Sequence, residues 1–431
     1  MQAANTFSAL RHRSFRLYWT GALVSLVGTW VQQTAQTYLV WELTRSPLAT
    51  SLPMFFFTLP SLLFSLLGGV IVDRVDRRRL LLVTQSLFAA QAAVLTALTW
   101  LGVVRVGHIN ALAFFSGLVM AVDAPARQSL VPNLVAREDL TNAIALNSLV
   151  FNASRIVGPP IGGLLYAARG PELAFLFNTI SFAAILYPLA ILSLPGEREG
   201  RRGTTMWADL WEGLRYVWTH PVVRTVLLLV ALMGMFGFSY LVLMPVMTTE
   251  VLGGGPAQNG YLLGAVGIGA TTGALLVAAG GRSGRPGRRL LWLGALAGAA
   301  LLAFAASRSL PVAAVILFAV GGCIIGFLAT ANATIQQLIP DALRGRTMSV
   351  YSLALLGSGP ANSLLAGALG SAVGAPRAIA ITGLLIILPI ALLALLGRSL
   401  VGEPQPPPDD TGGAGNSDGR LRGRGRKSVI P

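Results

Sequence analysis

The sequence has very few of the residues on which most metal centres and enzyme active sites are built. It has a single cysteine, Cys323, and only three histidines among 431 residues, so we expect no disulfide and no metal site of the cysteine or histidine type. Its one lysine, Lys427, lies in the C-terminal tail, whereas a nucleotide-binding P-loop needs a lysine next to its glycine-rich turn. We therefore expect no enzyme activity, no metal and no cofactor.

Charged residues are also scarce, and this points to a membrane. They make up 11% of the chain, while 54% is hydrophobic, and soluble proteins carry about a quarter charged residues. The mean hydropathy is +0.67. The net charge of +15 is spread as short arginine clusters between apolar runs. That pattern indicates membrane topology and gives no reason to expect a nucleic-acid partner.

The apolar runs divide the chain into membrane spans. Windows of about 20 residues, the length that crosses a bilayer, recur along the whole sequence and predict twelve transmembrane helices. We place them at residues 17–41, 48–72, 80–102, 108–131, 141–168, 172–195, 225–249, 257–281, 289–307, 310–339, 347–373 and 375–397.

The predicted fold is an all-α membrane protein of two pseudo-symmetric six-helix bundles. Short matches between the halves support a repeat: Gln128, Leu130 and Pro132 recur 208 residues later as Gln336, Leu338 and Pro340. Repeated six-helix halves are a common plan of transporters, with the substrate site at the interface between the repeats. The expected domains are an N-terminal bundle at 1–195, a cytoplasmic linker at 196–224, a C-terminal bundle at 225–398 and a disordered tail at 399–431.

The distribution of basic residues predicts the orientation. Of the 32 lysines and arginines, 25 lie in the N-terminus, every second loop and the C-terminus, and five lie in the other loops. Because cytoplasmic segments carry the excess of Lys and Arg, we expect both termini on the cytoplasmic side of the inner membrane.

The linker contains an amphipathic pattern and the tail a polar one. Trp207, Trp211 and Trp218 follow helical spacing, with charged residues on the opposite face, which predicts a helix lying at the cytoplasmic membrane surface. The tail is rich in proline, glycine and charge, so it is expected to be disordered. Its arginines either contact anionic lipid or are simply solvated.

Three charged residues stand inside predicted spans, where charges are costly and usually functional. Asp123 and Arg127 are four residues apart and share a helix face. They form a gate or proton relay, or else a mutual ion pair near the cytoplasmic interface. Arg155 lies near the middle of its span without an acid at its level. It either holds an anionic or carbonyl-bearing substrate in a watery cavity, or has a structural role.

Uncharged polar residues and one aromatic residue complete the predicted substrate cavity. Gln32 and Gln36 share a face of the first helix and either line the cavity or bond neighbouring helices. Asn152 stands beside Arg155, and Tyr240 belongs to a methionine- and aromatic-rich seventh span. Such a span suits a pocket for several apolar ligands, although simple packing explains it equally.

Two motifs of this chain resemble motifs of the major facilitator superfamily, and the resemblance to that superfamily extends over nearly the whole chain, to about residue 400. The loop between the second and third spans resembles the superfamily's signature loop. Residues near the middle of the fifth span resemble its antiporter motif, and neighbouring stretches look like its drug and siderophore exporters. The loop motif comprises Gly69, Asp73, Arg74, Arg77 and Arg78, and the antiporter motif includes Gly158, Pro159, Gly162 and Gly163.

The resemblance implies roles for these motifs. Asp73 would face the start of the eleventh helix near Arg346, and Arg77 would pair with Asp123. Together they would lock the halves while the cavity faces outward. The alternative is that the loop's charges only fix topology. The glycines and Pro159 would seal the cavity against ion leak, or form a simple packing kink.

The expected function is export of hydrophobic or amphipathic small molecules by proton antiport and alternating access. Many proton-coupled relatives carry an acid early in the first helix, but residues 25–30 contain none. Asp123 is thus the remaining candidate to carry the proton. The alternatives are export of an endogenous metabolite such as a siderophore, and an uncoupled facilitator or importer. The expected partners are the substrate, protons and membrane lipid, and the chain is expected to act as a monomer.

Overall fold

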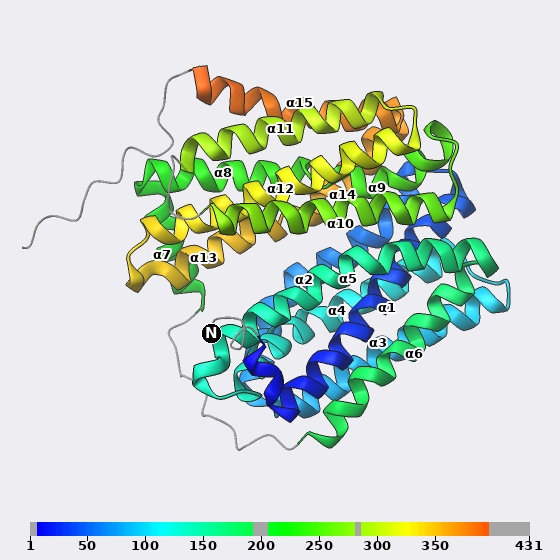
Figure 1. The fold of residues 1–431 in the computed structure, drawn as a ribbon, viewed down its shortest axis with the longest axis horizontal. Coiled ribbons are helices and arrows are strands. Elements are labelled where there is room, and N and C mark those ends of the chain that lie inside the picture. The colour runs from blue at the N-terminus through cyan, green and yellow to red at the C-terminus, as the bar shows by residue number, and fades with distance from the viewer. Residues whose placement is uncertain (1–6, 193–205, 281–285, 396–431) are drawn as a thin grey trace, which may run out of the picture.

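The structure is a computed structural model that describes residues 7–192, 206–280 and 286–395, and all regular structure in those ranges is helical (Figure 1). The predicted tail at 399–431 and the first part of the linker lie outside the described residues. The helices of the first half are η2 (Ser8–Arg11), α1 (Arg13–Thr44), α2 (Pro47–Arg74), α3 (Arg77–Trp100), α4 (Val106–Leu130), η3 (Val131–Asn133), η4 (Arg137–Asp139), α5 (Leu140–Arg169) and α6 (Pro171–Ile191). Those that follow are α7 (Met206–Thr219), α8 (Pro221–Phe236), α9 (Ser239–Val246), η5 (Met247–Val251), α10 (Pro256–Ala279), α11 (Pro286–Ala306), α12 (Leu310–Leu338), α13 (Asp341–Leu356), α14 (Gly359–Val373) and α15 (Ala375–Leu395).

The prediction of a multi-span helical membrane protein is confirmed. Ten helical segments in the described part are long and apolar enough to cross a membrane, with α8 to η5 forming one segment and α13 to α14 another. The long helices α1 and α5 are not among the ten. Both carry several glutamines or asparagines, and these residues lower the mean hydropathy of a helix that is otherwise apolar.

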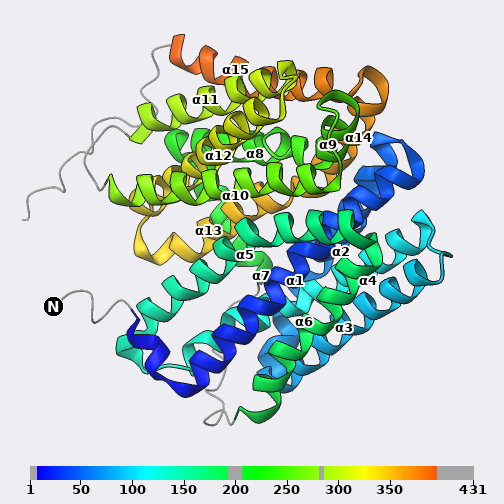
Figure 2. The ribbon, with the colours of Figure 1, turned by 45° about the vertical axis from the view of Figure 1, so that its right-hand side comes forward.

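The helices gather into two groups, α1 to α6 and α8 to α15, which lie side by side (Figures 1 and 2). Each group has its own apolar core. Phe15, Leu81 and Ile185 belong to a core within the first group, and Phe304 and Phe327 belong to the core of the second. Trp41 at the end of α1 is the exception, because it is buried in the core of the second group.

The two groups meet at one end of the molecule. The α2–α14 and α5–α10 pairs carry most of the contact between them. At the end where α1 finishes and α2 begins, Trp41 Nε1 donates to Thr249 Oγ1 at 2.8 Å and Leu48 N donates to Ser371 Oγ at 3.0 Å. Towards the end with the N-terminus and α7 the groups spread apart (Figures 1 and 2). If the orientation predicted from the basic residues holds, that spread end would face the cytoplasm.

Glycines allow the close approach of α5 and α10. A Cβ atom added at Gly163 would lie 2.4 Å from the carbonyl oxygen of Pro256, and one added at Gly260 would lie 2.4 Å from that of Pro159. One added at Gly267 would lie 2.9 Å from the carbonyl oxygen of Arg155. Membrane helices have no strong hydrophobic drive to associate, so small residues that admit close backbone packing stabilise the pair.

The linker contains a helix where the sequence predicts one. In α7, Val217 and Gly213 face the second group of helices, while the side chains of Trp211 and Trp218 are 71% and 62% exposed. Glu212 forms an ion pair with Arg346 of α13 at 2.5 Å. The side chain of Trp207 lies outside the described residues. The placement of α7 at the membrane surface stays a prediction.

A short N-terminal helix is tied to the loop before α5. Ser8 Oγ donates to Asp139 Oδ1 at 2.5 Å, and His12 Nε2 lies 2.7 Å from Asp139 Oδ2. Ala9 N also donates to Asn142 Oδ1 at 3.0 Å. The hydrogen bonds from Ser8 and His12 hold the pKa of the Asp139 carboxyl below its usual range. The carboxylate is thus the centre of this attachment.

The α5–α10 contact predicts the effect of adding one methyl group. Gly163→Ala would overpack the interface and lower stability by about 1–3 kcal/mol, seen as a lower thermal midpoint of the purified protein in detergent. Gly107→Ala is the matched control, since a Cβ atom there would meet nothing within 4 Å. Equal thermal midpoints for the two variants would contradict the close packing of α5 against α10.

The Asp139 attachment predicts a pH dependence. Because folding lowers the pKa of Asp139, its contribution is fully present above the unfolded-state value of about 3.9 and is lost as the pH falls through the lower folded value. Asp139→Asn should have the same effect at neutral pH. Hydrogen exchange of the backbone amides of residues 8–12 should then be faster than in the parent. Exchange no faster than in Glu138→Gln, a change of the exposed neighbouring acid, would refute the attachment.

Candidate functional site

A cavity of about 500 Å³ lies between the two groups of helices. Its walls come from α1, α2 and α5 on one side and from α8, α9, α10, α12, α13 and α14 on the other. Most of the wall is apolar, with Trp30, Phe151 and Phe238 as its large aromatic members. The polar members are Gln33, Thr34, Thr37, Thr58, Arg155, Asn259, Asn362 and Ser363. A volume of this size is in the range of ligand pockets for small organic molecules.

Among the described residues that line this cavity, Arg155 is the one that is charged. It lies in the middle of α5, about 22 Å from the start of the helix at 1.5 Å per residue. The described residues contain no acid within ion-pair distance of it. Tyr240 lies near enough to interact with it electrostatically. A guanidinium in a mostly apolar cavity attracts groups that carry negative charge or carbonyl oxygens.

The cavity adjoins breaks in two helices that the hydropathy pattern did not reveal. The seventh predicted span is divided between α8 and α9, and the eleventh between α13 and α14. The breaks meet: Ser239 Oγ donates to Asn362 Oδ1 at 2.8 Å, and a Cβ atom added at Gly234 would lie 2.4 Å from Ser358 Oγ. In transporters, interrupted helices expose backbone groups beside the substrate.

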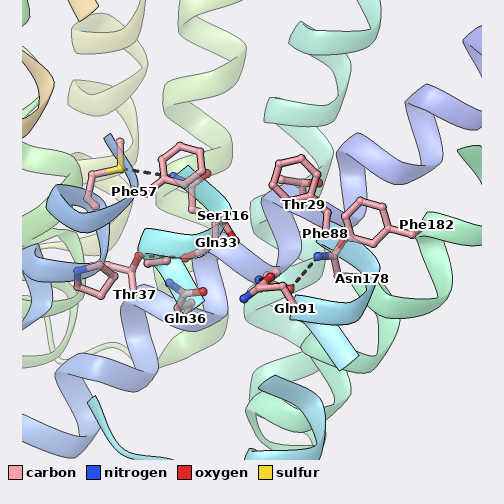
Figure 3. A pocket seen from close by; sticks show the side chains of 14 residues that line it. Thr29, Gln33, Gln36, Thr37, Phe57, Phe88, Gln91, Ser116, Asn178 and Phe182 are labelled. Carbon is pink, nitrogen blue, oxygen red and sulfur yellow. Dashed lines mark hydrogen bonds between the residues drawn. The ribbon is translucent and has the colours of Figure 1, made fainter. Parts of the chain in front are cut away.

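A second, smaller pocket of about 120 Å³ lies inside the first group of helices (Figure 3). It is lined from α1, α2, α3, α4 and α6. Gln33, Thr37 and Met54 line both pockets, so the smaller one adjoins the central cavity. We call it the side pocket. Its most polar wall consists of the amides of Gln32, Gln33, Gln36, Gln91 and Asn178.

The predicted cavity residues are distributed over different places. Arg155 lines the central cavity, and Gln32 and Gln36 line the side pocket. Asn152 lines neither pocket, and its Nδ2 donates to the carbonyl oxygen of Ser148 at 2.9 Å. Tyr240 is 1% exposed and also lines neither pocket, although its hydroxyl has no hydrogen-bond partner among the described residues. Their roles in transport stay predictions.

Several polar residues of the site were missed at the sequence level. Gln91 and Asn178 meet Gln32 in the side pocket, while Asn259 and Asn362 line the central cavity. Only Asn362 had a signal in the sequence, because it follows the second copy of the glycine–proline pair at residues 359–360. The other three are isolated amides in apolar helices.

Asp123 lies in a buried polar cluster near the spread end. It is 1% exposed, and its Oδ2 accepts from Arg127 Nε at 2.6 Å. Its Oδ1 accepts from Thr84 Oγ1 and from Gln85 Nε2, both at 2.6 Å. The hydroxyl of Tyr18 lies close enough to Arg127 to interact with it. The ion pair between Asp123 and Arg127 that helical spacing allowed is therefore formed. No ion pair between Asp123 and Arg77 is present in the described part of this state.

The loop motif is bound within its own half in this state. Asp76 caps α3 by accepting from Arg79 N at 2.7 Å. Arg78 donates from Nε to the carbonyl oxygen of Leu189 at 2.6 Å and also bonds that of Ala190, at the end of α6. Gly69 and Arg74 belong to α2, and Arg77 begins α3. The side chain of Asp73 lies outside the described residues.

The glycines of the antiporter motif serve two helix contacts. Cβ atoms added at Gly158 and Gly162 would lie 2.4 Å from Trp30 Cβ and 2.7 Å from the Val31 carbonyl oxygen on α1. Gly163 faces α10, as described above, and Pro159 lines the central cavity. The motif thus brings α5 close to α1 within its half and to α10 across the two halves.

Comparison with known proteins agrees with this architecture. The sequence model of a family described as transmembrane secretion effector matches residues 4–401. The multidrug efflux pump Tap of Mycolicibacterium fortuitum is 30% identical over 387 residues, covering 87% of this chain and 92% of the pump. Macrolide efflux protein A of Streptococcus pyogenes is 25% identical, covering 86% and 93%. The staphyloferrin A transporter of Staphylococcus aureus is 26% identical, covering 56% and 60%.

Solved structures share the fold. A bacterial homologue of the human lysosomal transporter Spinster, in an inward-facing and unoccupied conformation, matches with a TM-score of 0.68 at 15% identity, covering 90% of this chain and 97% of that one. The nucleoside transporter NupG matches with a TM-score of 0.70 at 9% identity, covering 89% and 99%. Identities this low show the fold alone. Together with the family match, they establish that this chain is a membrane transporter of the transmembrane secretion effector family, within the major facilitator superfamily.

Proposed function

We propose that this protein exports hydrophobic or amphipathic small molecules across the cytoplasmic membrane in exchange for protons. The observation that carries the proposal is the largely apolar cavity of about 500 Å³ between two halves that are in contact at one end and spread at the other. Alternating access requires such a cavity, with contact exchanged between its two ends. The efflux relatives support the direction of transport.

The proposed topology has twelve spans with both termini in the cytoplasm. The ten apolar segments, together with α1 and α5, give this number. The polar residues that lower the hydropathy of α1 face the two pockets, so they do not argue against a span. With the basic ends inside, the state described here is open to the cytoplasm, from which an exporter loads its substrate. The domains at 1–195, 196–224, 225–398 and 399–431 belong to the same proposal.

Asp123 is the proposed proton carrier. Its Oδ1 already accepts from Gln85 Nε2, and Gln85 Oε1 is a buried acceptor that has no partner among the described residues. If Asp123 took up a proton, rotation of the Gln85 amide would present that oxygen to the new O–H group. The neighbouring side chain is thus able to bond either protonation state, which a purely structural ion pair does not need.

Gating by the loop motif remains part of the proposal. In the cytoplasm-open state Arg346 pairs with Glu212 of α7. In an outward-facing state the spread ends would close, and α13 would approach the loop that carries Asp73 and Arg77. The motif would then hold the closed cytoplasmic end through contacts that the open state lacks.

A second candidate is export of an anionic metabolite such as a siderophore. The observation that favours it is Arg155 in the cavity wall, which has no ion-pair partner among the described residues. The similarity to the staphyloferrin A transporter supports it as well.

The transport proposal is tested in proteoliposomes that hold the purified full-length chain. With an imposed proton gradient, we expect a macrolide or a lipophilic dye to be accumulated against its gradient, and a protonophore to abolish the accumulation. Asp123→Asn should lose this pH-driven accumulation and retain only equilibration, because the neutral amide carries no proton. Glu138→Gln, at an exposed acid outside the helices that line the cavity, should behave like the parent. Transport by the parent that does not depend on the proton gradient would contradict antiport and indicate a facilitator.

The charge of the ligand is tested at Arg155. If the cavity holds anions, Arg155→Gln should weaken binding of a carboxylate-bearing siderophore by about tenfold or more, since a hydrogen bond to a charged group is lost. Binding of a neutral dye should change little. Arg377→Gln, at an exposed arginine outside both pockets, is the matched control. Equal binding of the siderophore to Arg155→Gln and to the parent would remove the anion candidate.

A further inference from the structure

The side pocket has a chemistry different from that of the central cavity. All its polar lining groups are neutral amides or hydroxyls, and no charged residue lines it. Its apolar lining includes Phe57 and the stacked rings of Phe88 and Phe182, whose centroids are 6.3 Å apart. Figure 3 shows the amide side chains and the aromatic rings around the same space. An ion would bind weakly in such a pocket, because it finds no counter-charge there. A wholly apolar group would also bind weakly, because it leaves the amides without hydrogen bonds.

The amides of the pocket are held in fixed positions by one another. Gln32 Nε2 donates to Gln91 Oε1 at 3.1 Å, and Gln32 Oε1 accepts from Asn178 Nδ2 at 2.7 Å. All three side chains are buried, with Gln91 5% and Asn178 2% exposed. Ser181 Oγ donates to Asn178 Oδ1 at 3.2 Å and so holds the side-chain amide of Asn178, the last member of this hydrogen-bond network. The network therefore orients the pocket wall before any ligand arrives.

Several hydrogen-bonding groups of this wall remain unused. Gln91 Nε2 and the whole amide of Gln36 make no hydrogen bond with the residues that the structure describes. Unbonded amide groups inside a membrane protein are costly. Water or a polar part of a ligand must therefore satisfy them. Together they offer donors from both residues and an acceptor from Gln36.

The size of the pocket limits the group that fits. At about 120 Å³, the side pocket has about a quarter of the volume of the central cavity, which has about 500 Å³. It therefore suits a compact substituent of a ligand better than the whole ligand. A primary carboxamide matches best, because it is planar beside the phenylalanine rings and presents both a donor and an acceptor.

We propose that the side pocket is a specificity subsite for a compact, uncharged hydrogen-bonding substituent, best a primary carboxamide, on a ligand whose apolar body occupies the central cavity. The subsite rests on the proposed function of that cavity as the substrate site. The shared lining residues Gln33, Thr37 and Met54 mark where the two parts of such a ligand would join. Arg155 lines only the central cavity, so the subsite has no cation for a carboxylate.

The test uses three fluorescent probes with one apolar body and different ends. Dansylglycinamide carries the carboxamide. N-isobutyl dansylamide has an isopropyl group in place of the carboxamide, and dansylglycine has a carboxylate there. Binding to the full-length chain in nanodiscs is followed by energy transfer from tryptophan to the dansyl group, because Trp30 lines the central cavity. We expect the carboxamide to bind about tenfold more tightly than the isobutyl probe, since it adds hydrogen bonds that the other lacks.

Two variants locate this preference. Gln36→Leu should abolish it by weakening the binding of the carboxamide probe, while the isobutyl probe binds no less tightly than to the parent. The substitution should not disturb folding, since Gln36 bonds no described residue. Gln91→Leu, which removes the other unused donor together with the acceptor of Gln32 Nε2, should reduce it as well. Asn152→Leu is the matched control, because it also removes an amide but lies outside both pockets, and it should keep the preference.

The outcomes separate the subsite from the cavity. Equal binding of the carboxamide and isobutyl probes, or a preference that survives both glutamine variants, would mean that the side pocket only holds water, while binding in the central cavity stands. Tightest binding of the carboxylate probe, lost in Arg155→Gln, would replace the subsite by an anion site. Failure of all three probes to bind would remove both the subsite and the proposed substrate cavity for this class of compound.

Discussion

The close backbone contact of α5 with α10 is the constraint on which the rest of the structure depends. The lipid is as apolar as the helices, so the halves gain little by burying leucine against leucine, and close packing of small residues is what remains. Gly163 and Gly260 supply it, each lying against the backbone of the other helix. A contact of this kind is strong only at one separation and one angle. It therefore holds the halves at one end and lets them spread at the other.

The cavity that this arrangement leaves explains how polar groups persist within the membrane. Arg155 stands in the middle of α5, where a guanidinium facing lipid would be very costly, but it lines the cavity. Asp123 is protected in another way, since Arg127, Thr84 and Gln85 all donate to its carboxylate. One charge is thus placed in an accessible space and the other in a satisfied cluster, and the two suit different tasks. In the proposed mechanism, Arg155 would meet ligands, and Asp123 would change its hydrogen bonds only when its neighbours move.

The sequence predicted much of the fold and part of the site, and the division has a physical cause. The pattern of apolar and charged residues indicates where long apolar helices, charged loops and amphipathic helices lie, so the spans and the linker helix could be predicted. It does not report local interruptions, so the breaks between α8 and α9 and between α13 and α14 were missed, although Gly359 and Pro360 stand at the second. Nor does it assign isolated amides to a pocket. Gln91 and Asn178 meet Gln32 only because α3 and α6 pack against α1, and Asn152 turns back to its own helix.

The two halves divide the chemistry unequally. Asp123, Arg127 and Arg155, the charged residues inside the helices that line or support the site, all belong to the first half, as does the amide network of the side pocket. The described second half contributes the interrupted helices and most of the apolar wall. A half with a fixed network of hydrogen bonds resists deformation, because moving one member breaks the bonds of the next. A half with helix breaks bends at those points. In the proposed transport cycle, the first half would therefore be the rigid frame that recognises the ligand, and the second half would close around it.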